Sequence, residues 1–294
     1  MTEPASLFSL GMTRFAKVRR DLEAVVVQGR VASGCYEFLL FGFKQGWACL
    51  FGGLMLALLL GTHFFYPADL PLHRYDFLTL AAVGIQALML LLRLETLREA
   101  WVICTFHVVG TVMELFKTAA GSWIYPEASL LHIGPVPMFS GFMYAAVGSY
   151  IARIWRIFDF RFTGYPPRWT TILLAAAIYV NFFAHHWLPD LRLGLFAFAI
   201  FLFRRTTIWF TPFRRARAMP LLVGFFLVAL FIWFGENIGT FANAWTYPDQ
   251  KDGWHLVSIG KLGSWYLLMI ISFVLVSLIH AAAPSEASIK PVSA

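Results

Sequence analysis

The chain has 294 residues, of which 59% are hydrophobic, 17% are aromatic and only 13% are charged. A soluble domain carries about 25% charged residues, and the mean hydropathy here is +0.69, so a water-soluble globule is excluded. Intrinsic disorder is excluded too, because a disordered chain needs low hydrophobicity and high charge. The composition predicts an all-α, polytopic transmembrane bundle.

The net charge of +7 does not indicate a nucleic-acid-binding protein. The basic residues lie between apolar runs of membrane-spanning length, where membrane topology explains them better than phosphate binding does. The three cysteines, Cys35, Cys49 and Cys104, form no C-x-x-C motif and are odd in number, which argues against a disulfide framework.

Eight apolar runs are long enough to be spans, since a crossing needs about 20 apolar residues. They are 46–65, 75–93, 98–117, 136–156, 169–188, 191–210, 219–240 and 258–281. Residues 1–45 precede them as a basic cytoplasmic segment. The part of this segment from Leu7 to Val27 is either an amphipathic helix on the inner leaflet or an unstructured tail.

The distribution of basic residues predicts the orientation of the chain. Eighteen of the 23 Lys and Arg residues fall in the N-terminal segment, the even-numbered connections and the C-terminal tail. Positive charge accumulates on the cytoplasmic side of a membrane. We therefore expect both termini, including the tail 282–294, in the cytoplasm.

An internal repeat emerges when the chain is compared with itself. Glu114 is followed by Trp123-x-Tyr125-Pro126-Glu127, and 122 residues later Glu236 is followed by Trp245-x-Tyr247-Pro248-Asp249. The same offset relates His63 to His185. The matches predict two parallel four-helix repeats, 46–158 and 169–281, joined by a cytoplasmic linker at 159–168 and related by a pseudo-two-fold axis along the membrane normal.

The ionisable residues suggest a site near the outer surface. Glu114, Glu236, His63 and His185 lie at the outer ends of their predicted spans, and His107 lies near the middle of its span. Charged groups within spans usually face the bundle interior. We expect these five residues around one outward-opening cavity as candidate catalytic groups. The inner half offers little beyond Gln86 and Ser149.

Polar and aromatic neighbours complete the predicted site. The candidate substrate-binding residues are Trp123, Tyr125, Trp245, Tyr247, Asn181 and Asn237. Each group also has a structural interpretation, since Trp and Tyr are common interfacial anchors and the carboxylates can simply bind the loops that fold over them. No cofactor is predicted, although His63, His185, Glu114 and Glu236 are residue types that bind zinc or iron.

Several segments resemble a known family, the bacterial domain-of-unknown-function family 817. They include Phe106-His107, Glu114-Leu115-Phe116-Lys117, Gly121-Ser122-Trp123-x-Tyr125-Pro126-Glu127, Gly141-Phe142-Met143-Tyr144, Ala177-Ile178-Tyr179-x-Asn181-Phe182-Phe183-x-His185-His186 and Glu236-Asn237-Ile238. The resemblance spans about 45–280 and implies a multi-pass protein of the bacterial inner membrane with no established activity. Residues 110–145, including Gly134-Pro135-Val136-Pro137, are also similar to motifs of membrane carotenoid hydratases and cyclases, but lack the second acidic residue that the cyclases carry beside a proline.

Three functions fit these patterns. The first is an intramembrane enzyme that acts on a lipid or isoprenoid-like substrate through its carboxylates, tuned by partial burial. The second is a small-solute transporter, which the repeat favours but the apolar inner half does not. The third is a structural or partner-binding membrane protein that uses the W-x-Y-P loops as a docking surface. The lipid bilayer is the one partner that all three share.

Overall fold

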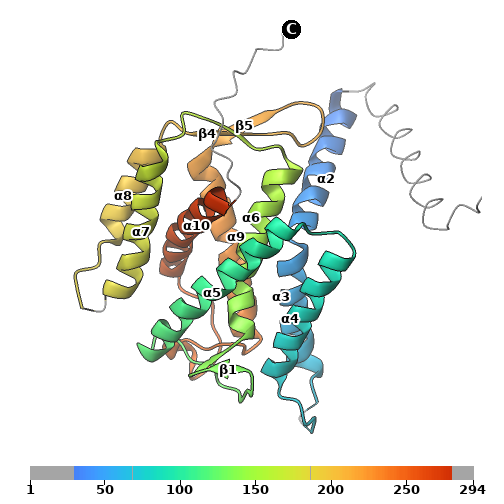
Figure 1. The fold of residues 1–294 in the computed structure, drawn as a ribbon, viewed down its shortest axis with the longest axis vertical. Helices are drawn as coiled ribbons and strands as arrows, with labels where there is room; N and C mark the ends of the chain where they lie inside the picture. Colours follow the sequence, from blue (N-terminus) through green and yellow to red (C-terminus); the bar gives the residue numbers. More distant parts are fainter. Residues whose placement is uncertain (1–29, 68, 186, 280–294) are drawn as a thin grey trace, which may run out of the picture.

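The computed structural model describes residues 30–279 except 68 and 186 (Figure 1). The predicted amphipathic stretch 7–27 and the tail 282–294 lie outside this range. The helices are α2 (Arg30–Ala48), α3 (Leu50–Phe65), α4 (Arg74–Leu91), α5 (Leu97–Ala119), α6 (Phe139–Ile157), α7 (Arg168–Ala184), α8 (Arg192–Phe203), α9 (Leu221–Phe241) and α10 (Ile259–Ile279). The short elements are β1 (His132–Ile133), β2 (Val136–Pro137), β3 (Arg161–Thr163), β4 (Thr207–Phe210), β5 (Arg217–Pro220) and the 3-10 turn η1 (Pro248–Gln250).

The helices identify a membrane protein. In the described part of the chain, α4, α5, α9 and α10 are each long and apolar enough to span a bilayer, and α2 and α3 together form a fifth candidate bent by 68°. Helices α7 and α8 are apolar but shorter. Every predicted run contains a helix, whereas the total of eight crossings stays a prediction.

Three predicted boundaries differ from the structure. The run 191–210 is helical only to Phe203, because Arg204 and Arg205 interrupt it and the β-branched and aromatic residues after them form strand β4. The predicted linker 159–168 contains strand β3, which pairs with β4. The predicted boundary at residue 45 falls inside α2, whose Lys44 Nζ donates to the carbonyl of Pro212 at 2.8 Å.

The two ends of the bundle carry different structures. Strands β3, β4 and β5 form a three-stranded antiparallel sheet at one end. The β1–β2 hairpin and the two W-x-Y-P loops lie at the other end, at the bottom of Figure 1. We call this second end the outer end, since the basic-residue distribution predicts that it faces outward.

Small residues bring α5 and α6 into close contact. A Cβ on Gly110 would lie 2.7 Å from the Tyr144 side chain, and one on Gly148 would lie 2.7 Å from the ring of Phe106. A Cβ on Gly141 would lie 2.4 Å from Nδ1 of His107. Without a hydrophobic driving force between helices in lipid, such close backbone approach is what stabilises helix pairs.

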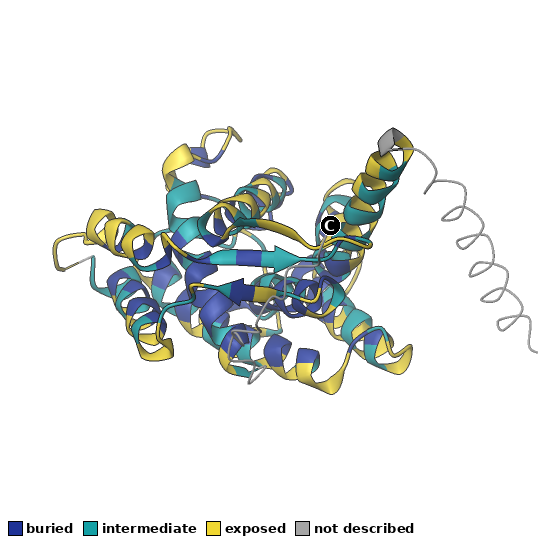
Figure 2. Cartoon of the chain, turned by 90° about the horizontal axis from the view of Figure 1, so that it is seen from above, coloured by how far each residue is buried: buried dark blue, intermediate teal, exposed yellow. Residues whose placement is uncertain are grey.

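The outside of the bundle is apolar. Large hydrophobic side chains are well exposed on several helices; they include Phe38, Leu91, Trp101, Leu193 and Phe231. In Figure 2 exposed residues lie around the periphery of the bundle and buried residues lie within it. A soluble monomer rarely shows so much apolar surface, so these side chains indicate contact with lipid.

Candidate functional site

Glu114 and Glu236 lie at equivalent helix ends and are both buried, with 3% and 7% of their surfaces exposed. Helix α5 ends with Gly121 at φ +71°, and the Ser122 N–H donates to the carbonyl of Lys117. Helix α9 ends in the same way, with Asn243 at φ +53° and the Ala244 N–H donating to the carbonyl of Gly239. At both helix C-termini, this left-handed residue turns the polypeptide back over the glutamate of the helix that has just ended.

The aromatic residues of each loop bind the glutamate of the preceding helix. Trp123 Nε1 and Tyr125 Oη donate to Glu114 Oε2 at 2.7 and 2.6 Å. In the second copy, Trp245 Nε1 donates to Glu236 Oε1 at 2.9 Å, and Tyr247 Oη donates to the same oxygen. The structure thus brings these residues together in the way that the structural interpretation of the carboxylates describes.

The two loops also meet each other. Ile124 and Thr246, the central residues of the W-x-Y motifs, form an isolated antiparallel bridge. The Ile124 N–H donates to the Thr246 carbonyl at 3.0 Å and the Thr246 N–H donates to the Ile124 carbonyl at 2.9 Å. Ile124 and Thr246 are 122 positions apart, which is the offset between the two W-x-Y-P motifs. Equivalent residues on either side of a two-fold axis would pair in the same way.

The two loop tyrosines remain hydrogen-bond donors. Burial first, and then the neighbouring carboxylate, raise the pKa of the Tyr125 and Tyr247 phenols well above their ordinary value. Both phenols therefore stay protonated at physiological pH. The hydrogen bonds from Trp and Tyr offset the free-energy cost of burying each carboxylate. They also fix each loop to the helix that carries its glutamate.

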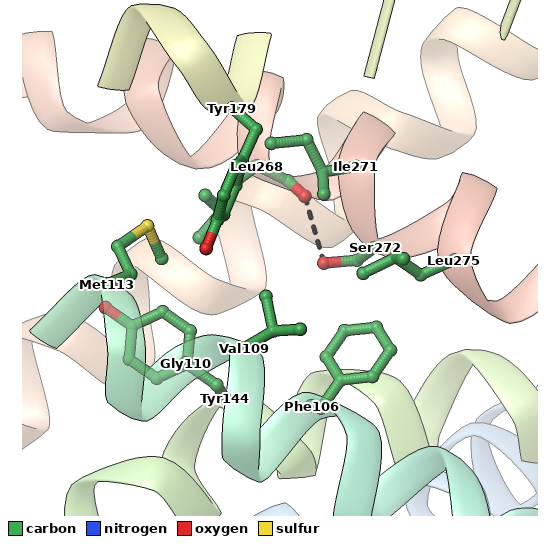
Figure 3. A pocket seen from close by; sticks show the side chains of 10 residues that line it. All are labelled: Phe106, Val109, Gly110, Met113, Tyr144, Tyr179, Leu268, Ile271, Ser272 and Leu275. Carbon is green, nitrogen blue, oxygen red and sulfur yellow. Dashed lines mark hydrogen bonds between the residues drawn. The ribbon is translucent and has the colours of Figure 1, made fainter. Parts of the chain in front are cut away.

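Tyr144 connects Glu114 to a pocket that sequence reasoning missed. Its hydroxyl donates to Glu114 Oε1 at 2.7 Å, and its ring lines a small apolar pocket of about 20 Å³ among α5, α6, α7 and α10. Figure 3 shows Met113 and Tyr144 at one end of this pocket and Phe106 and Leu275 at the other. The other lining residues are Val109, Gly110, Tyr179, Leu268, Ile271 and Ser272.

The histidines do not surround the carboxylates as expected. His63 is exposed, and its ring packs 5.5 Å from that of Phe241. His185 Nδ1 lies 3.0 Å from the carbonyl of Asn181 in its own helix. His107 lies two turns below Glu114 against the ring of Phe142, and its buried Nδ1 has no hydrogen-bond partner in the described structure.

The two predicted substrate-binding asparagines hold loops. Asn181 accepts from the Leu191 N–H at 3.0 Å and donates to Asp190 at 3.2 Å, which fixes the segment 187–191 that precedes α8. Asn237 accepts from the Val257 N–H at 2.9 Å. In both halves of the chain, the asparagine side chain therefore holds the backbone of the segment before the next helix.

The structure does not gather the possible metal ligands. Among the residues that it describes, no three His, Cys, Asp or Glu side chains form a group that could hold a metal ion. Glu114 and Glu236 instead receive Trp and Tyr donors.

The inner half contains a polar cluster that the sequence did not predict. Arg153 is fully buried, lies 3.6 Å from Glu95 and donates to the carbonyls of Trp47 and Leu94. Glu95 also accepts from Gln86 and Ser149, the two residues singled out above. The expectation of an almost apolar inner half was wrong, because charges at the ends of α4–α6 fold inward.

Fold and site together define a multi-helix membrane protein with two loop-capped carboxylates at one end. The chain belongs to the family described as "Protein of unknown function (DUF817)", whose model matches residues 37–273. It is 43% identical over 237 residues to the uncharacterized protein YoaT of Bacillus subtilis (strain 168), covering 81% of this chain and 89% of that one.

A solved structure is also similar. The mycobacterial Insig homolog MvINS from Mycobacterium vanbaalenii matches with a TM-score of 0.46 and 12% identity, over 65% of this chain and 97% of that chain.

Proposed function

We propose that this protein is an intramembrane enzyme that binds a lipid or isoprenoid-like molecule and acts on it by proton transfer through Glu114 and Tyr144. The observation that carries the proposal is the position of Tyr144, which lines the apolar pocket and donates to Glu114 at 2.7 Å. A buried carboxylate beside an apolar site is suited to general acid–base chemistry.

The pocket must widen for such a ligand. Its volume of about 20 Å³ is close to that of one water-sized probe. The unbranched side chain of Met113 lies at one end and adapts readily to a new shape. We therefore expect the ligand to displace Met113 and to lie along α5 and α10.

We further infer that the chain crosses the bacterial inner membrane eight times, as two parallel four-helix repeats with both termini in the cytoplasm. The matched helix stops, the matched Trp and Tyr contacts and the Ile124–Thr246 bridge support the repeat. The repeat is incomplete at the pocket, because Tyr266, the counterpart of Tyr144, packs against Phe196 and Phe225 instead. Only the first half would then act on the ligand.

Lipid and pigment profiling of a deletion strain tests the activity. We expect one hydrophobic compound to accumulate, and wild type and Tyr266→Phe to restore the normal profile. Tyr144→Phe and Glu114→Gln should fail to restore it while the proteins remain in the membrane. Restoration by Tyr144→Phe would contradict the proposal, and loss of the Glu114→Gln protein from the membrane would make the carboxylate structural.

A small-solute transporter is the second candidate, and the inner polar cluster favours it. Glu95 and Arg153 at the inner side, His107 midway and Glu114 at the outer end lie at or near the α5–α6 contact. Transport needs polar groups along such a route. Altered solute uptake in the deletion strain, with an unchanged lipid profile, would support this candidate over the enzyme.

A further inference from the structure

Three basic side chains converge at the outer end of the apolar pocket. Lys117 lies one helical turn beyond Met113 on α5, and Lys261 lies seven residues before Leu268 on α10, so both continue the faces that line the pocket. Arg192 begins α8 and its Nη1 lies 3.4 Å from Oγ of Ser264 on α10. Lys117 is within electrostatic range of both other cations.

Aromatic rings hold the two lysines in place. Lys261 Nζ lies 4.0 Å from the ring centre of Tyr247 and 5.5 Å from that of Trp123, so it sits between the two W-x-Y loops. Lys117 Nζ lies 5.7 Å from the ring of Phe182, and only 6% of the residue is exposed. Neither lysine lines the pocket itself, and each is held against an aromatic ring beyond the pocket's outer end.

The carboxylates near these cations differ in their partners. Asp190 accepts from both the backbone and the side chain of Arg192. Glu236 accepts from Trp245 and Tyr247. Asp249 lies 3.7 Å from the ring of His255. Glu236 is thus bound by its own loop and Arg192 is already paired with Asp190, so an additional anion at the mouth of the pocket would bind chiefly through Lys117 and Lys261.

We propose that the pocket takes an anionic amphiphile whose phosphate group lies among Lys117, Lys261 and Arg192 and whose apolar chain runs toward Phe106 and Leu275. This inference rests on the proposed function and assigns its ligand a chemical class. Lysine and arginine are the side chains that bind phosphate. Lys261 lies seven residues before Leu268 in the helix, a distance of about 10 Å. The head group of the ligand would therefore lie at the membrane boundary, and its apolar chain would lie deeper in the membrane.

Lipid-induced thermal stabilisation of the full-length protein in detergent tests the inference. We expect phosphatidylglycerol to stabilise the wild type, and phosphatidylcholine and inorganic phosphate to do so at least ten-fold more weakly. Equal stabilisation by phosphatidylcholine would overturn the role of the cations. Equal stabilisation by inorganic phosphate would overturn the role of the apolar chain.

Variants separate binding from folding and from chemistry. Lys117→Gln with Lys261→Gln should weaken the phosphatidylglycerol effect at least ten-fold, whereas Lys117→Arg with Lys261→Arg and the exposed control Lys251→Gln should keep it. Unchanged binding by the double Gln variant would overturn the inference. Tyr266→Phe, which lies outside the pocket, should keep the effect. The stabilisation is measured without turnover, so failure of the proposed chemistry would leave this result intact.

Discussion

Gly239 provides a sharp test of the loop-capped carboxylate. It lies in α9 one turn after Gly235, and a Cβ placed on it would meet Cη2 and Cζ2 of Trp245 at 2.1 and 2.4 Å. These atoms belong to a rigid indole whose Nε1 is 2.9 Å from Glu236. In Gly239→Ala the ring must move by about 1 Å or more to reach ordinary contact distance, which breaks this hydrogen bond.

The expected loss of stability follows from these contacts. Overpacking costs about 1–3 kcal/mol, and losing a hydrogen bond to a carboxylate costs about 1.5–3 kcal/mol. The better helix propensity of alanine returns about 1 kcal/mol, so Gly239→Ala should lose about 1.5–5 kcal/mol.

Gly235→Ala is the matched control, because its Cβ would meet only Leu56, at an ordinary 3.7 Å. It should gain up to about 1 kcal/mol. Unfolding of both purified variants in mixed micelles with increasing sodium dodecyl sulfate measures the difference. If Gly239→Ala unfolds within about 0.5 kcal/mol of Gly235→Ala, Trp245 does not occupy the position described.

Three other predictions concern different parts of the molecule. Arg153→Met should lose about 3–5 kcal/mol of stability, because it leaves Glu95 buried without its cation; thermal unfolding in detergent should show partial recovery when Glu95→Gln is added. Gly141→Ala should lose about 1–3 kcal/mol through its clash with His107 and Thr111, and a second change, His107→Ala, should relieve part of it. Burial raises the pKa of Asp190, but its hydrogen bonds lower it further, leaving it below its ordinary value. The segment 187–191 should thus be protected from hydrogen exchange above about pH 4, near the pKa of Asp in the unfolded chain, and lose protection as pH falls through the lower pKa of the folded protein. Asp190→Asn should remove that dependence.

Hydropathy and self-comparison predicted much of this structure. Apolar length located α3 to α10, since burial in lipid is a property of whole segments, but it did not locate α2, which begins within the predicted cytoplasmic segment. The fixed offset of 122 residues predicted that Trp123 and Tyr125 relate to Glu114 as Trp245 and Tyr247 relate to Glu236, because repeated sequence makes repeated contacts. In the structure Trp123 and Tyr125 bind Glu114, and Trp245 and Tyr247 bind Glu236.

Other features depended on side-chain direction, which the offset alone does not give. The buried positions of α3, which include Met55, Leu59 and Thr62, define its inner face, and His63 falls one residue off that face. This signal was available in the helical spacing. Tyr144 could not be found in the same way, because its counterpart Tyr266 lies in a different environment.

The inner polar cluster was missed for a related reason. Glu95 and Arg153 lie near the ends of predicted spans, where charges usually face water, so their positions in the sequence do not indicate a buried pair. The buried pair forms because the residues around Leu94 fold over α6 and bring Arg153 onto backbone carbonyls. Glu95 and Arg153 are 58 positions apart, so their contact cannot be detected from local hydropathy.

The central claim is that the two W-x-Y loops meet across an approximate two-fold axis and close over both carboxylates. Cysteines at Ile124 and Thr246, in a chain without its three natural cysteines, test it most directly. A hydrogen-bonded antiparallel pair places the two Cα atoms about 5.5 Å apart, within the range of a disulfide. Mild oxidation in membranes should give an intramolecular crosslink in nearly all of the protein, whereas a protein that stays reduced would contradict the account.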